Sequence, residues 1–423
     1  MFFELPYGSG TLSVEVPDGN LVDVLQPQEP DEPPVTDIAA AVRRALAAPL
    51  DGPSFGDLLR RRPQRIVVVV EDVTRANPYY REALEALVQT VPADLRAGLR
   101  FVVALGTHRP HTVEDNRRAY GDLSDRFAFI NHDCDAPDMA CIGTTSFGNE
   151  VRINRTVAEA DLTVLTGAVD THSFAGYTGT RKALMPGVAA RDTITRNHAM
   201  VCDPAAVMGE ADVNPLARDM MEAAHLFARG RSVFVLNFIK DHRRRLRAVL
   251  AGGIDAVHRE GTGIARGLCA TPFGHATDVC IVSCGGRPRD INLYQAQKSY
   301  GCAAMAVRPG GTVILLAECP EGIGQELFGR WLREYPRDRI LSMSPGEIVV
   351  EGHRAYLTAR LLQRTRCILV SSMQPDVVAS LGFEYAPDAA AALAACVRRY
   401  GADYTCRVIP NGSATLPVPT GRK

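Results

Sequence analysis

Seven short apolar runs recur along the chain, and they constrain its fold more than any other feature. Each run is continuously apolar rather than alternating, which is typical of parallel strands buried on both faces. Helical patterns such as 81–91 and 217–230 lie between the runs, and strand–helix alternation of this kind predicts an α/β architecture. The runs are 65–72, 99–108, 161–170, 232–241, 278–286, 311–319 and 365–373.

The chain has 423 residues, which is enough for two or three domains. Residues 4–19 (ELPYGSGTLSVEVPDG) predict a hairpin, and residues 262–276 predict a linker. We expect two α/β domains with mostly parallel sheets and the active site in the cleft between them. The N-terminal domain would span residues 1–270 and the C-terminal domain residues 276–399. The tail of about 400–423 either completes the second domain or returns to the first.

Composition argues against several classes of protein. The net charge of −1 gives no basic surface for nucleic acid or lipid, and the apolar runs are too short to cross a membrane. The N-terminus lacks the charged and apolar regions of a signal peptide. Eleven cysteines occur without any CxxC pair, which indicates free thiols in a reducing compartment. We therefore expect a cytoplasmic protein with neither nucleic-acid nor membrane partners.

Lysine is rare in this sequence. Of 47 basic residues only four are lysines, at positions 182, 240, 298 and 423. A chain that uses arginine for general positive charge keeps lysine where a nucleophilic amine has a use, because only lysine has an amine that can be deprotonated. Lys182, Lys240 and Lys298 are therefore candidates for chemistry, whereas Lys423 ends the chain.

Chemically active side chains follow the apolar runs, where ligands bind in open parallel sheets. This convergence predicts a functional site. Each residue also has a structural interpretation: Asp72 and Thr74 fit a helix cap, His108 a turn, His111 an exposed or capping position, and His198 the interior of a helix. The candidate residues at these run ends are Asp72, Thr74, Arg75, His108, Arg109, His111, Asp170, His172, Lys182, Arg287, Asp290, Tyr294, Gln295 and Lys298.

The segment 170–189 (DTHSFAGYTGTRKALMPGVA) combines a histidine, two glycines and Lys182. Its spacing does not match the phosphate-binding loop G-x-x-x-x-G-K-[ST], and Ala183 replaces the hydroxyl that would hold magnesium. Glycines after a strand still allow backbone N–H groups to approach a phosphate. A Schiff-base role for Lys182 also stays open, with Arg181 as a neighbouring cation that would lower the pKa of the lysine amine.

Five motifs together identify a family. DVTRANP, GTHRPHT, DTHSFAGYTGTRKALMPG, NHAM and INLYQAQKSY occur in this order, and the chain resembles the nickel-pincer lactate racemase family over nearly its whole length. The resemblance implies two α/β domains and a nickel-pincer nucleotide, a pyridinium mononucleotide whose two sulfur-containing groups and one ring carbon bind nickel. It also implies a small 2-hydroxy acid as substrate and cofactor-biosynthesis enzymes as partners.

The resemblance also implies residue roles. Lys182 would anchor the cofactor covalently, with the segment Thr178, Gly179 and Thr180 near its phosphate, and His198 would bind nickel. His108 and His172 would be the two acid/bases, and Asp72 would orient a catalytic histidine. Arg75 and Lys298 would bind the substrate carboxylate, with Tyr294 and Gln295 nearby. Histidine suits proton transfer near neutral pH, and neutral imidazole suits nickel.

Three alternatives remain open at the level of sequence. The same scaffold would serve a C2 epimerase of a polyhydroxy (aldonic) acid or a malate racemase. A Schiff-base lyase or aldolase using Lys182 is more remote, and a non-enzymatic protein that binds a nucleotide or carboxylate is weaker still. The motifs do not specify which 2-hydroxy acid binds, although residues 145–150 and 351–356 are candidates for selecting it. The oligomeric state is not indicated.

Overall fold

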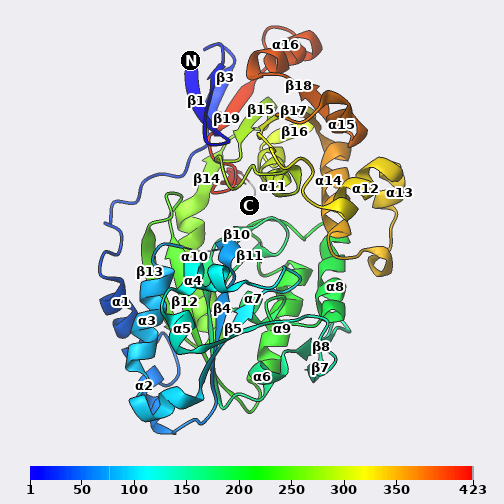
Figure 1. The fold of residues 1–423 in the computed structure, drawn as a ribbon. Coiled ribbons are helices and arrows are strands. Elements are labelled where there is room, and N and C mark those ends of the chain that lie inside the picture. Colours follow the sequence, from blue (N-terminus) through cyan, green and yellow to red (C-terminus); the bar gives the residue numbers. More distant parts are fainter. Residues whose placement is uncertain (76, 422–423) are drawn as a thin grey trace. The chain divides into compact units, whose positions relative to one another are not determined.

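The computed structural model describes residues 1–75 and 77–421, which divide into two compact units (Figure 1). We call Pro30–Leu268 the central unit. We call Met1–Glu29 together with Cys269–Lys423 the terminal unit. Both units have the predicted mixture of helices and mostly parallel strands. Within the described residues, no helix has both the length and the apolar character needed to cross a membrane.

This division differs from the predicted domain boundaries in the first 29 residues. Strand β3 (Leu21–Val24) pairs in parallel with β19 (Cys406–Ile409), so the chain start belongs with the chain end, as the blue and red strands of Figure 1 show. The tail also stays in the terminal unit, because β20 (Leu416–Pro419) pairs with β14 (Ala270–Phe273). The units divide between Leu268 and Cys269, within the predicted linker 262–276, but helix α10 (Ile254–Cys269) and β14 occupy this segment in place of a loop.

The central unit is built on a six-stranded sheet in the order β13-β12-β9-β4-β5-β6, parallel except for β13. Strands β4 and β9 have apolar sequences and are buried along almost their whole length. The chain runs from β4 outward through β5 and β6, then returns to the other side of β4 with β9. This reversal makes the carboxyl ends of β4 and β9 a topological switch point, where such sheets bind ligands. The strands are β4 (Ile66–Glu71), β5 (Leu99–Ala104), β6 (Ala128–Asn131), β9 (Leu162–Val169), β12 (Ser232–Lys240) and β13 (Leu246–Gly252).

Helices and two small hairpins complete the central unit. Helix α4 begins with a capping box made by Thr112 and Asp115, and α9 begins with Pro215 after the capping side chain of Asn214. Aromatic and aliphatic side chains from the sheet and from α1, α2 and α3 form the largest core cluster. The helices are α1 (Ile38–Ala47), α2 (Phe55–Arg60), α3 (Tyr80–Thr90), α4 (Val113–Tyr120), α5 (Leu123–Arg126), α6 (Arg155–Ala158), α7 (Arg181–Leu184), α8 (Arg191–Ala199), α9 (Pro215–Ala228) and α10, with short 3-10 turns η1 (Val73–Arg75), η2 (Ala93–Gly98) and η3 (Met200–Cys202). The hairpins are β7 (Ala140–Thr144) with β8 (Glu150–Ile153), and β10 (Thr171–His172) with β11 (Gly176–Tyr177).

The terminal unit has a second six-stranded sheet, in the order β18-β17-β16-β15-β19-β3, and all of its strands are parallel. The predicted N-terminal hairpin is confirmed as β1 (Phe2–Tyr7) with β2 (Gly10–Glu15). The chain reverses direction across this sheet between β15 and β19, which gives a second switch point. The remaining strands are β15 (Thr277–Ser283), β16 (Val307–Leu316), β17 (Arg366–Val370) and β18 (Glu384–Ala386). The helices are α11 (Leu293–Ala304), α12 (Glu326–Glu334), α13 (Arg337–Leu341), η4 (Pro345–Glu347), α14 (Gly352–Arg364), α15 (Pro375–Ser380) and α16 (Ala389–Tyr400).

Candidate active site

Asp72 and His108 form a close pair at the carboxyl ends of β4 and β5. The Asp72 side chain is 3% exposed, and its Oδ2 lies 2.7 Å from Nδ1 of His108, whose side chain is 49% exposed. Burial alone would raise the pKa of Asp72, but the hydrogen bond from His108, the charges of His108 and Arg75 and the Thr74 hydroxyl hold that pKa well below its usual range. An ionised carboxylate accepts only, so Nδ1 of His108 carries the hydrogen and Nε2 keeps its lone pair.

His111 packs next to this pair and binds the turn that follows Asp72. Its burial corrects the prediction of an exposed or capping residue. It is buried, and its Nε2 accepts the N–H of Val73 at 2.9 Å, while Nδ1 bonds Oδ1 of Asn116 at 3.0 Å. The bond to Val73 fixes η1, the turn that carries Arg75. These residues line a small cavity whose walls are Asp72, Val73, Thr74, Leu105, His108, Arg109 and His111.

His172 and His198 are brought together by an aromatic ring that the sequence did not single out. The ring of Phe174 is buried and meets the imidazole of His172 edge to face, with centroids 4.6 Å apart, and that of His198 at 5.3 Å. His198 lies in α8, as expected, and is 8% exposed. The N–H of Ala175 donates to Nδ1 of His172 at 3.2 Å. In its neutral form His172 therefore carries its hydrogen on Nε2, the opposite of His108.

Lys182 follows a loop with unusual backbone geometry. Gly176 and Gly179 have φ of +73° and +80°, and a Cβ at Gly179 would lie 2.6 Å from Cγ2 of Val169, so that position requires glycine. Thr180 has φ of +39°, which is strained for a β-branched residue. Its N–H and Oγ1 both bond Oδ1 of Asn237, at 3.0 and 2.5 Å. The loop is thus held in a conformation that the local chain would not adopt alone, and it presents a half-buried Lys182.

The predicted phosphate segment, Thr178 to Thr180, directs its polar groups into the protein. Oγ1 of Thr178 donates to the carbonyl of Ala168 at 2.8 Å, and the N–H of Thr178 donates to the carbonyl of Asp170 at 2.8 Å. The N–H and the hydroxyl of Thr180 bond Asn237, as described above. The glycines are therefore explained by the packing of the loop itself. A role for this segment at a phosphate stays a prediction from the resemblance.

Lys240, another of the four lysines, is the last residue of β12. Its side chain is 12% exposed, and Nζ forms an ion pair with Asp170, two residues before His172. Nearby, Oε1 of Glu71 accepts the N–H of Ala168 at 2.8 Å, while Oε2 is buried and has no hydrogen-bond partner among the described residues. Burial raises the pKa of Glu71, and the charges of Arg75 and Lys240 oppose this rise. One lysine and two carboxylates, those of Asp170 and Glu71, therefore follow or end the central strands of this sheet.

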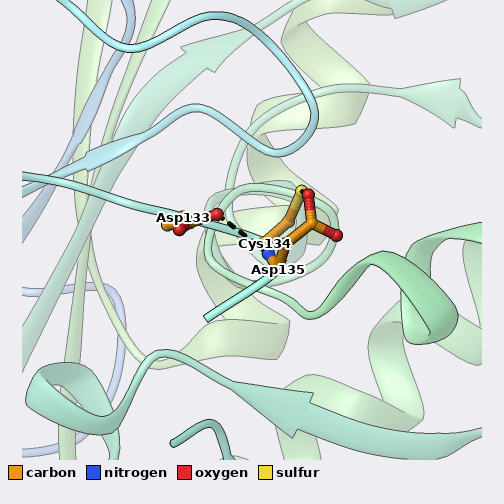
Figure 2. Close-up of side chains that lie close together, drawn as sticks. All are labelled: Asp133, Cys134 and Asp135. Atoms are coloured by element: carbon orange, nitrogen blue, oxygen red, sulfur yellow. Dashed lines mark hydrogen bonds between the residues drawn. The ribbon is translucent and has the colours of Figure 1, made fainter. Parts of the chain in front are cut away.

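One group of side chains in the described part of the chain has metal-ligating spacing: Asp133, Cys134 and Asp135 (Figure 2). Its geometry fits a turn better than a metal. The N–H of Asp135 donates to Oδ1 of Asp133 at 2.9 Å, and Arg191 binds both carboxylate oxygens of Asp135 at 2.7 and 2.6 Å. Burial also raises the pKa of the Cys134 thiol, which disfavours the thiolate that a metal needs. A role for His198 as a metal ligand stays a prediction from the resemblance.

The terminal unit holds the other three predicted residues on one face of α11. Asn292 caps this helix by accepting the N–H of Gln295 at 3.1 Å, and Nζ of Lys298 donates to Oε1 of Gln295 at 2.5 Å. Tyr294 is one turn before Lys298. Burial raises the pKa of Tyr294, and the Arg354 guanidinium lies 5.4 Å from its ring centroid. Residues 351–356 are candidates for selecting the 2-hydroxy acid, and the buried residue Arg354 lies in this segment.

The functional residues that sequence reasoning missed share one property, because they act through other residues. Phe174 packs against both His172 and His198, and Asn237 holds Thr180. Asn237 is a polar residue in an otherwise apolar strand, and this pattern was the one available signal for it. Phe174 carried no such signal.

Comparisons with known proteins agree with this arrangement. Residues 7–209 match the model of the lactate racemase N-terminal domain, and residues 274–416 match that of the C-terminal domain. The lactate racemase of Thermoanaerobacterium thermosaccharolyticum is 31% identical over 98% of both chains. That of Lactiplantibacillus plantarum is 29% identical over 98% of this chain and 99% of its own.

Solved structures give the same result. The lactate racemase apoprotein from T. thermosaccharolyticum superposes with a TM-score of 0.92 at 29% identity, covering 99% of this chain and 100% of that one. A protein from Thermotoga maritima shares the fold at a TM-score of 0.68 and 18% identity, covering 93% of this chain and 100% of that one. The match to both domain models and the full-length identity lead to one conclusion: the chain belongs to the lactate racemase family of isomerases.

Proposed function

We propose that the protein racemises a short 2-hydroxy acid such as lactate by inverting its C2 centre. The observation that carries this proposal is the placement of His108 and His172 after β5 and β9, the two strands that flank β4. Strands two places apart in a sheet lie about 10 Å from each other, which leaves room for a small acid between the two imidazoles. Arg75 follows β4 itself and offers a cation for the substrate carboxylate between them.

In this proposal the two histidines exchange the hydroxyl proton of the substrate on opposite sides of C2. His108 uses the lone pair on Nε2, because Asp72 holds its Nδ1 hydrogen and stabilises the imidazolium that forms. His172 presents Nε2–H in the geometry observed, and it becomes a base at Nε2 when its hydrogen resides on Nδ1 and the bond from Ala175 is released. Lys298, with Tyr294 and Gln295, is proposed to add a second contact to the carboxylate.

The C2 hydrogen is hardly acidic, so the histidines alone do not account for inversion. We propose that the chain holds a nickel-pincer nucleotide, with Lys182 as its covalent anchor and His198 as the protein ligand of the metal. When bound, this group accepts the C2 hydrogen as hydride and returns it. The half-buried amine of Lys182 and the buried imidazole of His198 support this assignment.

A malate-like substrate is the second candidate, because Arg354 packs on Tyr294 and adds a cation to the face of α11 that holds Lys298. A Schiff-base reaction at Lys182 is the third. It predicts that borohydride traps a keto substrate on the lysine and that nickel is dispensable.

The deciding experiment is intact-protein and peptide mass spectrometry of the protein produced together with the cofactor-biosynthesis enzymes. We expect added mass on the peptide containing Lys182 and none in Lys182→Ala or Lys182→Arg. Loaded protein is then incubated with separate enantiomers of lactate, malate and an aldonic acid in deuterated water. Inversion without deuterium at C2 supports hydride return, whereas deuterium at C2 contradicts it. Unmodified wild-type Lys182 contradicts the proposed anchor.

A further inference from the structure

Arg181 is a fully buried cation directly beneath the loop that presents Lys182. Its side chain is 1% exposed. Nη2 donates to the carbonyl of Ala175 at 3.1 Å and approaches that of Tyr177 at 3.5 Å, while Nη1 contacts the imidazole of His258 in α10. The guanidinium therefore points inward and binds the backbone of the loop from its buried side.

No carboxylate compensates this charge in the part of the chain that the structure describes. Among the described residues no carboxylate charge contributes to the pKa shift of Arg181, which burial alone causes, and its Nε lacks a hydrogen-bond partner among them. Burial lowers the pKa of Arg181 to about 10, so the guanidinium stays charged near neutral pH. Burial, followed by the charge of Arg181, lowers the pKa of His258 to about 2, so the imidazole stays neutral. Two carbonyls and a neutral ring satisfy hydrogen bonds but leave one positive charge unbalanced.

A buried, unbalanced charge is costly unless something offsets it. A neutral donor would bind the carbonyls of Ala175 and Tyr177 equally well. These hydrogen bonds therefore do not explain why the buried residue is a charged arginine. The N–H groups of Thr178 and Thr180 already donate inside the protein, which leaves little backbone donor capacity for an anion at this loop. The buried guanidinium of Arg181 would attract an anion at this loop, which these N–H groups do not.

We propose that Arg181 is the buried counter-charge for the anionic part, a phosphate, of the nucleotide attached at Lys182, and that His258 keeps it in place as a neutral acceptor. This inference rests on the proposed function for the identity of the nucleotide. Arg181 acts as a positioning residue, because it lies behind the loop rather than in contact with the ligand. The anionic group completes the charge balance of the loop when it binds.

His258 allows the charge to be cancelled without being removed. In His258→Glu a carboxylate faces the guanidinium and pairs with it internally, whereas His258→Gln keeps a neutral acceptor. We expect His258→Glu to remain folded, with an unchanged or higher Tm, and to carry the added mass on Lys182 in a fraction at least tenfold smaller than wild type. His258→Gln should load like wild type. Equal loading of these two variants would overturn the proposal.

Direct variants of Arg181 give a second measurement. Arg181→Met should load poorly and Arg181→Lys should recover most of the loading, because it restores the charge without the fork of hydrogen bonds. A purely structural role predicts equal loss in both. Arg231→Met is the matched control, since Arg231 also bonds two backbone carbonyls, those of Ala158 and Phe227, but lies at the end of α9.

A binding assay separates this inference from the proposed function. Unloaded wild type, His258→Gln and His258→Glu are titrated with nicotinamide mononucleotide and with inorganic phosphate, and Tm is recorded. We expect both probes to raise the Tm of the first two proteins and to leave His258→Glu unchanged. This outcome supports the counter-charge even if Lys182 carries no added mass. An equal rise in all three proteins rejects it.

Discussion

His108 and His172 follow the two strands that flank β4, yet their surroundings differ in kind. Nδ1 of His108 faces the buried carboxylate of Asp72, whereas Nδ1 of His172 accepts a backbone N–H from Ala175. A carboxylate accepts the hydrogen on Nδ1, whereas an N–H donor requires the lone pair there. In their neutral forms the two histidines are therefore held as opposite tautomers. The acid/base roles proposed above use this difference, since His108 offers a lone pair on Nε2 and His172 a hydrogen.

The largest expected effect comes from removing either imidazole. His108→Asn and His172→Asn should each lower kcat for racemisation by roughly 10²–10⁴-fold, the usual contribution of general acid–base catalysis. Chiral chromatography from each pure enantiomer measures the loss. The double variant should be little worse than either single variant, because the two histidines act in one reaction. Independent, multiplying losses would contradict the paired role.

Asp72→Asn tests whether the carboxylate at Nδ1 of His108 contributes to turnover. We expect kcat to fall by about 10–100-fold, the range seen when a partner that orients a functional histidine is lost. Ala175 offers no matching side chain to remove. Thr74→Val is the control, because it removes only the hydroxyl that donates to Asp72.

Asp72→Asn should also change how the free energy of unfolding depends on pH. The pKa of Asp72 is lower in the folded protein than the value of about 3.9 in an unfolded chain, so its stabilisation is present above that value. It is lost as the pH falls through the folded value. The difference in free energy of unfolding between wild type and Asp72→Asn should therefore be largest at neutral pH and shrink below about pH 4. Urea unfolding at several pH values measures it, and a difference that grows on acidification would contradict the pairing.

Asn237→Ala tests the loop on the His172 side. It removes the acceptor of two bonds from Thr180 and the donor to the carbonyl of Gly167, all of them buried. We expect a loss of about 2–4 kcal/mol in unfolding free energy, since buried partners are left unsatisfied. Lys182 should also load less completely. Ser146→Ala, which removes the exposed bond from the Ser146 hydroxyl to Glu222, serves as the control for hydrogen-bond loss elsewhere.

The smallest expected effect is at Arg354. Arg354→Met keeps the packing on Tyr294 but removes the cation. A dicarboxylate substrate would then show a several-fold rise in KM, while lactate would change by less than about twofold. Loss of activity toward both acids to the same extent would indicate a structural role.

Much of the architecture was predictable because it depends on local pattern. Apolar runs such as 65–72 and 161–170 became β4 and β9, and polar residues after them mark the switch point. The domain division fell inside the predicted linker, but helix α10 continues through Gly263 and Gly267 into that segment. Both lie on the open side of α10, where a Cβ would contact nothing, so the helix tolerates them. The pairing of β3 with β19 was not predictable, because four residues carry no mark of a partner nearly 400 positions away.

The sequence named candidate site residues but not their geometry. Motif positions named His108, His172, Lys182 and His198, whereas the opposite tautomers and the inward turn of Arg181 depend on tertiary contacts. The nickel-pincer cofactor and the residue roles remain predictions that the experiments above address.

The position of β3 in the terminal sheet sets the order in which the molecule is able to form during synthesis. The central unit is one uninterrupted segment, Pro30–Leu268, and all of its strands have left the ribosome before the sheet of the terminal unit has its second strand. The hairpin of β1 and β2 and the strand β3 emerge first, but β3 waits for β19 in the last twenty residues. Domains generally fold as units while the chain grows. Residues 1–29 are therefore synthesised before the central unit but can complete their sheet pairing only after it. Premature termination near residue 400 would leave the edge strand β3 without its partner.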